Sequence, residues 1–234
     1  MEIIKKIKYW GVIPTIKNVI ALVKRYTRLF FWGFSSPGRE DEYVSKFFPK
    51  DYKGFYVDIG TNDPVILNNT YYFHRRGWKG INIEPNPECF NRILSKRPRD
   101  TNLNIGLGKS NGVLDYYLFY PDLVSTFSKC ESEENIKSGY RLISIVKIPV
   151  RRLENVLDEY LLENQEIDFM SIDTEGYDFL ILENMNINKY KPRFICLEDF
   201  KDNNFGKINN LLVTSGYRKV FSNTHNSIYE RVPK

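Results

Sequence analysis

Short apolar runs alternate with amphipathic segments along most of this 234-residue chain. Residues 54–59 and 167–172 have the length and continuous apolar character of buried strands. Residues 87–96 and 153–162 instead place apolar side chains three and four positions apart, which predicts helices packed on one side. Repeated strand–helix units predict an α/β fold, built on a mostly parallel sheet with helices on both faces.

The remaining elements continue this alternation. Further strands are expected at 80–84, 102–106, 113–119, 143–150 and 194–197, and further helices at 69–76, 177–185 and 205–215. Residues 217–221 and 227–231 predict a terminal antiparallel hairpin around Asn223 that closes the sheet. The polar stretch from 120 to about 139 has no clear periodicity and is expected to be irregular.

Residues 1–36 form an N-terminal arm with a different pattern. Its apolar positions recur at helical spacing and predict one side of an amphipathic helix: Ile13, Ile16, Val19, Ile20, Val23, Tyr26 and Phe30. The opposite side is basic, with Lys17, Lys24, Arg25 and Arg28, and an aromatic cluster follows at Phe30, Phe31, Trp32 and Phe34. Two interpretations stay open. The apolar side packs on the following domain or on a second subunit, or the helix lies on an anionic membrane.

The positive charge of the chain belongs to this arm. Residues 1–34 contain seven lysines and arginines and one acid, a net charge of +6, which leaves −1 for the remainder of a chain whose total is +5. Nucleic acid is therefore not a favoured partner, because its binding needs a basic face on the folded body. No charge-free apolar run reaches the roughly 20 residues that span a bilayer, and no signal-peptide cleavage site follows the arm.

The three cysteines show no Cys-x-x-Cys spacing, which argues against a disulfide framework and a structural zinc site. We therefore expect a cytoplasmic location, peripheral on the inner face of the membrane if the arm binds lipid.

Polar residues stand at the ends of the predicted strands. Asp58-Ile59-Gly60-Thr61-Asn62 ends the first strand and Glu84 the second. Because the carboxyl ends of parallel strands meet at one edge, these groups are expected to surround a ligand, with Glu84 placed to accept the hydroxyls of a ribose. The G-x-G-x-x-G signature is absent, since Pro64 stands where a glycine is expected, and this argues against the pyrophosphate of NAD or FAD. S-adenosylmethionine, which has a ribose and an adenine but no phosphate, fits better.

Four segments resemble FkbM-type methyltransferases: Val57-Asp58-Ile59-Gly60-Thr61-Asn62, Asn69-Thr70-Tyr71-Tyr72, the block from Gly77-Trp78-Lys79-Gly80 to Glu84-Pro85-Asn86-Pro87, and Ile167-Asp168 through Ile172-Asp173-Thr174-Glu175-Gly176-Tyr177. The likeness runs from about residue 54 to 232. It implies a Rossmann-like class I methyltransferase domain over residues 37–234 and S-adenosylmethionine as donor. It also implies O-methylation of a hydroxyl, here expected on a sugar, glycan or lipid-linked saccharide.

The resemblance also implies roles for individual positions. Asp58, Gly60, Thr61 and Asn62 line the methionine end of the donor, Glu84 binds its ribose, and Pro85 and Asn104 lie near the adenine. Asp173 and Glu175 border the methyl group. The departure from the family pattern is Asp63-Pro64, where many methyltransferases have a more glycine-rich loop.

Methylation of a sugar hydroxyl needs a general base. We expect His74 on the surface of its helix and His225 in the terminal turn, which leaves Asp173, Glu175 and Glu198, with Asp173 or Glu175 as the base. A magnesium ion held by these three acids is an alternative that we do not favour. Tyr120, Ser125 and Thr126, in the polar and aromatic stretch 116–138, are expected at a substrate wall, and capping of the core is an equal alternative.

Two other functional classes remain open. One is a nucleotide-dependent oxidoreductase on a Rossmann-like sheet, which the missing glycine signature disfavours. The other is a non-catalytic, membrane-associated scaffold with a methyltransferase-like fold, because a fold alone does not fix a function. The oligomeric state is left open, and a homo-oligomer is compatible with the sequence.

Overall fold

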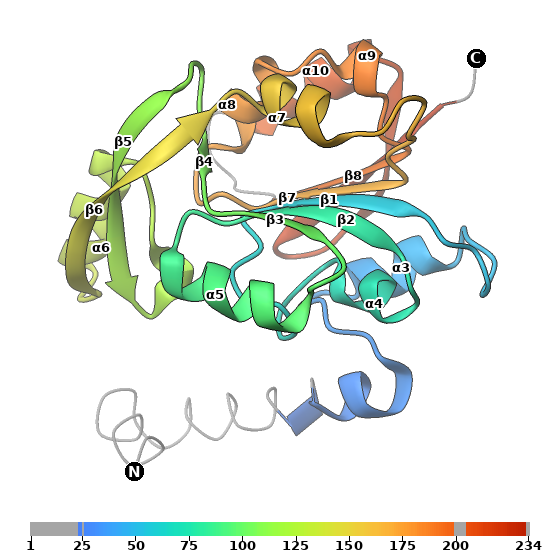
Figure 1. Cartoon of the computed structure of the whole chain (residues 1–234), viewed down its shortest axis with the longest axis horizontal. Helices are drawn as coiled ribbons and strands as arrows, with labels where there is room; N and C mark the ends of the chain where they lie inside the picture. The colour runs from blue at the N-terminus through green and yellow to red at the C-terminus, as the bar shows by residue number, and fades with distance from the viewer. Residues whose placement is uncertain (1–22, 25, 199–204, 233–234) are drawn as a thin grey trace.

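The computed structural model describes residues 23–24, 26–198 and 205–232, and a seven-stranded sheet forms its centre (Figure 1). In spatial order the strands are β3 (Thr101–Leu103), β2 (Lys79–Ile83), β1 (Phe55–Ile59), β7 (Phe169–Ile172), β8 (Phe194–Glu198), β10 (Asn226–Arg231) and β9 (Tyr217–Ser222). Strand β10 runs antiparallel to both of its neighbours, and the other neighbouring pairs are parallel. The predicted mostly parallel sheet with a terminal antiparallel hairpin is confirmed.

Helices cover both faces of this sheet (Figure 1). One face carries α3 (Glu40–Ser45), α4 (Tyr71–Arg75) and α5 (Pro87–Lys96), and the other carries α7 (Leu153–Tyr160), α8 (Asp178–Glu183), α9 (Ile187–Tyr190) and α10 (Phe205–Thr214). Asn86 caps α5, its side chain accepting from the backbone N–H of Glu88, and Pro87 follows at the first helical position.

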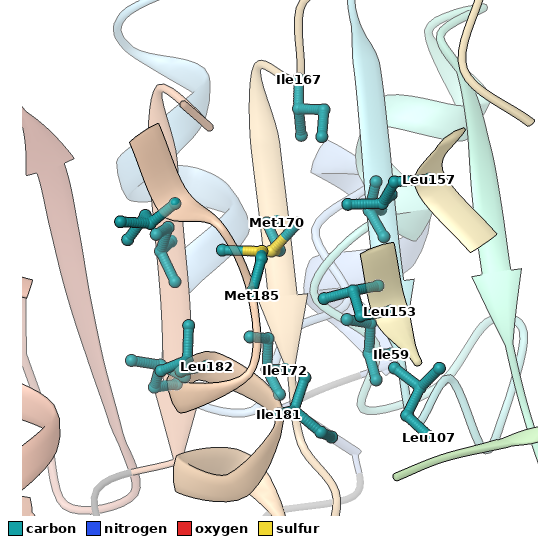
Figure 2. Packing of buried hydrophobic residues seen from close by; sticks show 14 of the residues in the cluster. Ile59, Leu107, Leu153, Leu157, Ile167, Met170, Ile172, Ile181, Leu182 and Met185 are labelled. Carbon is teal, nitrogen blue, oxygen red and sulfur yellow. The ribbon is translucent and has the colours of Figure 1, made fainter. Parts of the chain in front are cut away.

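The face under α7 to α10 is apolar. Ile59 of β1 belongs to one buried cluster with Leu153 and Leu157 of α7 and Ile181 of α8 (Figure 2). Successive strand residues point to opposite faces of a sheet. Tyr56 and Asp58, which stand on either side of Val57, therefore point to the face opposite that of Ile59. The opposite face carries a second buried apolar cluster, which includes Tyr56, Phe73 and Phe169, and a polar network lies beside it.

That opposite face holds a polar network centred on Arg97, whose side chain is fully buried. Its guanidinium donates to the Thr70 hydroxyl at 2.8 Å, the Asn82 side-chain oxygen at 3.0 Å and the Asn68 side-chain oxygen at 2.6 Å. The carboxylate of Asp58 lies 3.5 Å away. Two further bonds, at 3.0 and 2.8 Å, hold the carbonyl of Pro64. Arg97 therefore joins β1, β2 and the loop that follows β1.

A smaller three-stranded sheet is inserted after β3. It consists of β4 (Gly106–Leu107), β6 (Arg141–Arg151) and β5 (Gly112–Tyr120), in that order. The prediction of one strand over residues 102–106 was wrong, because the chain leaves the main sheet after β3 and enters the smaller one at Gly106. Asn104 stands at this departure, its amide donating to the carbonyls of Glu84 and Pro85 at 2.8 and 3.0 Å.

The expectation of an irregular stretch up to about residue 139 was also wrong. The segment contains a 3-10 turn, η1 (Asp122–Val124), and a helix, α6 (Lys129–Lys137). The Ser128 side chain caps α6 by accepting from the Glu131 backbone N–H. The helix is polar along its length, so it lacks the apolar periodicity by which helices are recognised in a sequence.

The two histidines behave differently. His225 lies exposed in the turn between β9 and β10, as predicted, and its N–H donates to the Asn223 side chain. His74 is buried, contrary to the prediction, and its Nδ1 lies 3.0 Å from the Asp100 carboxylate. Asp100 also contacts Asn82, so His74 sits at the edge of the Arg97 network rather than on the surface.

Helical backbone precedes the domain at residues 23–24 and 26–32. Val23, Tyr26 and Phe30, the end of the predicted apolar stripe, are exposed, so for these three residues packing on the core is wrong. The other stripe residues, Ile13, Ile16, Val19 and Ile20, lie outside the described residues. Within the described part of the chain, no helix is long and apolar enough to cross a bilayer.

Replacing Arg97 with methionine is expected to lower the free energy of unfolding by about 3–5 kcal/mol, because Asp58 is then left buried without a counter-charge. Lys147→Met is the control. It removes an ion pair with Asp115 that is exposed on both sides, and should cost less than about 1 kcal/mol. Chemical denaturation of both variants tests this, and a loss below about 1 kcal/mol for Arg97→Met would contradict the role given to the network.

Candidate active site

The site is built where the strand order reverses, between β1 and β7. Gly60 follows β1 with φ of 79°, and Asp173 follows β7. A Cβ atom on Gly60 would overlap the carbonyl oxygen of Asp173. Only glycine allows both this backbone conformation and this close approach. The two loops therefore meet at the edge where ligands of open parallel sheets bind.

A cavity of about 650 Å³ opens at this edge. The strand ends supply one part of its lining: Ile59, Gly60, Asn62, Ile83, Glu84, Pro85, Asp173, Thr174 and Glu175. Residues of the inserted segment and of the neighbouring helix supply the rest: Ile105, Gly106, Leu107, Tyr116, Asp122, Leu123, Ser125, Phe127, Tyr177 and Ile181.

Glu84 is fixed at one side of the cavity. One of its oxygens accepts from the backbone N–H of Asn62 and the other from that of Asn86, both at 2.7 Å. Each oxygen keeps a second lone pair, which is the acceptor pair that two ribose hydroxyls require. Burial raises the pKa of Glu84 to about 7, opposed by these two N–H groups.

The inserted segment forms the opposite wall. The ring of Phe127 lies against Gly106, where a Cβ would clash with it, and contacts Tyr116 at a centroid distance of 4.6 Å. The Thr126 hydroxyl donates to Glu131 of α6 at 2.8 Å, and the Glu131 carboxylate lies where a Cβ on Gly176 would sit. Helix α6 is thereby joined to the loop that carries Asp173 and Glu175.

Three carboxyl groups converge next to this loop. Asp173, Glu175 and Glu198 place oxygen atoms within 4.8 Å of one another. Asp173 and Glu198 lie close together, and the charge of Asp173 adds to burial in raising the pKa of Glu198. Two carboxyl groups this close do not ionise independently, so they titrate as a pair.

Burial perturbs all of these acids. It raises the pKa of Glu175 to about 8, with the charges of Asp173, Glu131 and Asp178 adding to the effect. The pKa of Glu198 rises to about 10 through burial and the charges of Asp173 and Glu175. Burial also raises the pKa of Asp178 to about 7. Clusters of acids with raised pKa values beside a cavity are typical of catalytic sites.

The sequence-predicted site residues divide into two groups. Those that line the cavity are Gly60, Asn62, Glu84, Pro85, Ser125, Asp173 and Glu175. Glu198 is not part of the cavity lining, and its buried Oε2 has no hydrogen-bond partner among the described residues. The cavity lining does not include Asp58, Thr61, Asn104, Tyr120 or Thr126.

Residues of the second group support the site from outside. The Thr61 hydroxyl donates to the Asp58 carbonyl at 3.2 Å, and the Asp58 carboxylate belongs to the Arg97 network. Asn104 holds the loop of Glu84 and Pro85. Tyr120 is exposed at the end of β5, with Arg141 over its ring. Direct contact between these residues and a bound donor or acceptor stays a prediction, because none of them lines the cavity.

Sequence reasoning missed Asp122, which lines the cavity and pairs with Arg92 of α5 at 2.8 Å. It lies in the stretch expected to be irregular, and a single acid in a polar loop gives no pattern to detect. Ile105 and Leu107 were missed for a related reason. They flank the point where the predicted third strand divides between the two sheets.

A family model described as the methyltransferase FkbM domain matches residues 58–219, which include the Gly60, Glu84 and Asp173 loops. The chain belongs to the FkbM methyltransferase family. The members of this family are S-adenosylmethionine-dependent methyltransferases, and the fold described above is the class I methyltransferase fold that the sequence predicts. A comparison with curated protein sequences finds no match.

Solved structures similar to this FkbM-family chain are distant in sequence. The methyltransferase FkbM from Methylobacillus flagellatus KT is 14% identical with a TM-score of 0.47, over 76% of this chain and 43% of that one. The chain therefore spans less than half of that protein. A TehB-like S-adenosylmethionine-dependent methyltransferase from Corynebacterium glutamicum is 9% identical with a TM-score of 0.44, over 90% and 96% of the two chains. The human methyltransferase 10 domain containing protein is 13% identical with a TM-score of 0.46, over 92% and 95%.

The raised pKa of Glu175 predicts a pH dependence of stability. Because its folded pKa is about 8 against an ordinary value of 4.5, the folded state holds this proton more tightly, so stability is lost as pH rises through about 8. Glu175→Gln removes that loss. The Tm of the ligand-free variant should fall less than that of the parent chain between about pH 6 and pH 8.5.

The control is Glu159→Gln, on the exposed side of α7, where the bond to Arg151 lowers the acid's pKa instead. This variant should keep the slope of the parent chain between those pH values. An unchanged slope for Glu175→Gln would show that Glu175 is not a buried, proton-binding acid.

Proposed function

We propose that this chain transfers the methyl group of S-adenosylmethionine to a hydroxyl of a sugar, glycan or lipid-linked saccharide, with a carboxylate as general base. The observation that carries the proposal is the convergence of Asp173, Glu175 and Glu198 beside a cavity whose other side holds Glu84. An acceptor of low acidity needs such a base, and these acids are the ionisable groups that the structure places there.

The cavity fits the donor. Glu84 presents two carboxylate oxygens, each with a free lone pair, to which we assign the ribose hydroxyls. Gly60 allows a ligand to approach the backbone, and Ile105, Leu107 and Phe127 offer apolar surface for a flat ring. When bound, S-adenosylmethionine supplies a methyl group on a positively charged sulfur, and a positive charge favours the ionised forms of nearby acids.

The protein's part of the reaction is proton removal and alignment. The acceptor hydroxyl would lie within hydrogen-bond reach of Asp173 or Glu175, whose carboxylate would take its proton. The oxygen–methyl bond would form as the sulfur–methyl bond breaks, which leaves neutral S-adenosylhomocysteine. Glu198 lies close to Asp173 and titrates together with it. Positioning of acceptor and donor in line supplies the remaining rate enhancement.

The sugar class of the acceptor is supported by the rings of Tyr116, Phe127 and Tyr177 in the cavity lining. Aromatic faces stack on the apolar faces of sugars. The acid cluster further favours an acceptor that is uncharged near its reacting hydroxyl, because the three acids would repel a phosphate or carboxylate there.

The same three carboxyl groups are near enough to bind a divalent cation, for which oxygen ligands suit magnesium. We propose direct base catalysis rather than metal-assisted deprotonation. Methylation that persists in excess chelator supports the direct base. Loss of methylation in chelator, restored by magnesium, would replace it with metal-assisted deprotonation.

Calorimetric titration separates the donor assignment from its rivals. S-adenosylhomocysteine should bind and NAD should not, because the cavity lacks a glycine-lined pyrophosphate loop. Glu84→Gln should weaken S-adenosylhomocysteine binding by about tenfold or more through loss of charged hydrogen bonds. The control Glu88→Gln alters an exposed neighbour on α5 and should bind normally. Heat with NAD alone would favour an oxidoreductase, and no heat with either ligand would favour a non-catalytic scaffold.

The base assignment is tested by complementation of a strain that lacks this gene. Mass spectrometry of its surface glycans should show one lost methyl group, which the parent gene restores. Asp173→Asn and Glu175→Gln should lower turnover, the base variant by at least about 100-fold, while S-adenosylhomocysteine binding persists. The control is Asp158→Asn, which removes an exposed ion pair with Lys189 outside the cavity lining. This variant should restore the methyl group fully. Full restoration by both active-site variants would rule out a carboxylate base here.

A further inference from the structure

The helix that precedes the domain presents its apolar side to solvent. Phe30, Phe31 and Trp32 are 81%, 68% and 61% exposed, and Val23 and Tyr26 are 59% and 52% exposed. Phe30, Phe31 and Trp32 contact one another, with ring centroids 5.1 and 5.8 Å apart, and five large exposed apolar side chains within ten residues are more apolar surface than soluble monomers commonly leave uncovered. We call these five side chains the aromatic patch.

The helix contacts the body through polar groups. The Arg28 guanidinium donates to the Ser36 carbonyl at 3.4 Å and lies 3.9 Å from the carboxylates of Asp41 and Glu42. Arg75 of α4 donates to the carbonyl of Leu29 at 3.3 Å. With these polar contacts in place, the aromatic patch is exposed and does not pack on the domain.

The turn after the helix keeps this orientation. The N–H of Gly33 donates to the carbonyls of Arg28 and Leu29 at 3.1 and 3.0 Å, and Gly33 has φ of 80°, which ends the helix. Phe34 then stacks on Tyr72 of α4 with ring centroids 4.5 Å apart. The helix lies beside the α4 end of the domain, apart from the sheet (Figure 1).

We propose that the aromatic patch and the basic arm bind the surface of an anionic membrane. The charge of the arm is the deciding argument, because residues 1–34 carry +6 while the rest of the chain carries −1. Tryptophan, tyrosine and phenylalanine are the side chains that enter the headgroup region, and lysine and arginine beside them attract anionic lipids.

A second copy of the chain is a weaker occupant for the same patch. A two-fold contact through it would bring two arms of equal positive charge together, which is repulsive over the distances that salt does not screen. An anionic bilayer instead neutralises that charge. The proposal goes beyond methyl transfer, and it would bring the enzyme to the surface where a lipid-linked saccharide resides.

Co-sedimentation of the full chain with vesicles tests the proposal. Vesicles of phosphatidylcholine and phosphatidylglycerol in equal amounts should bind the chain, vesicles of phosphatidylcholine alone should bind it far less, and added salt should weaken the binding. The combined change Phe30→Ser, Phe31→Ser and Trp32→Ser should weaken binding by about tenfold or more, since it removes most of the inserted apolar area.

The matched control is Val113→Ser, Ile143→Ser and Ile145→Ser, three similarly exposed apolar residues on the smaller sheet. This variant should bind vesicles like the parent chain. Both triple variants should keep S-adenosylhomocysteine binding, which tests folding and the donor site separately from the membrane. Trp32→Ser alone gives a milder version should the triple change disturb folding.

Two results would overturn the proposal. One is equal vesicle binding by the parent chain and the aromatic-patch variant. The other is no vesicle binding by the parent chain together with a dimer that the aromatic-patch substitutions dissociate, which would assign the patch to a second copy.

Discussion

The buried guanidinium of Arg97 is the interaction on which the site depends. It joins the carboxylate of Asp58 on β1, Asn82 on β2 and the carbonyl of Pro64 in the loop between them. A buried ion pair adds little net stability by itself, but removing one partner is costly, so such a pair fixes a single arrangement. Here Arg97 fixes the conformation of the loop that contains Asn62, and the backbone N–H of Asn62 in turn donates to the Glu84 carboxylate.

Close backbone contacts at glycines extend this order to the second half of the site. Gly60 lets the β1 loop touch the carbonyl of Asp173, and Gly176 lets Glu131 of α6 rest on the loop of Glu175. The β1 loop and the acid cluster are therefore held in register by the backbone contact between Gly60 and Asp173, and the Glu131 side chain supports the second loop. Such rigidity is what alignment of a hydroxyl with a methyl donor requires.

The sheet could be predicted because its signals are local and repeated. Apolar runs mark β1, β2, β7 and β8, and the acids at their ends follow from the rule that such ends share one edge. The position of the Asp63-Pro64 loop could not be predicted from the sequence, since the carbonyl of Pro64 accepts from Arg97, 33 residues away. His74 was misplaced for the same reason, because its partner Asp100 is distant in the chain. Helix α6 was not predicted because its sequence is polar. The Ser128 and Glu131 pair at its start matches a capping box and could have indicated where it begins.

The most direct test of the account is a crystal structure of the chain with S-adenosylhomocysteine. The ribose hydroxyls should lie on the carboxylate of Glu84 and the sulfur beside the loop of Asp173 and Glu175, with the rings of Tyr116 and Phe127 along the cavity. A ligand bound away from Glu84, or with its sulfur turned away from the acid cluster, would contradict it.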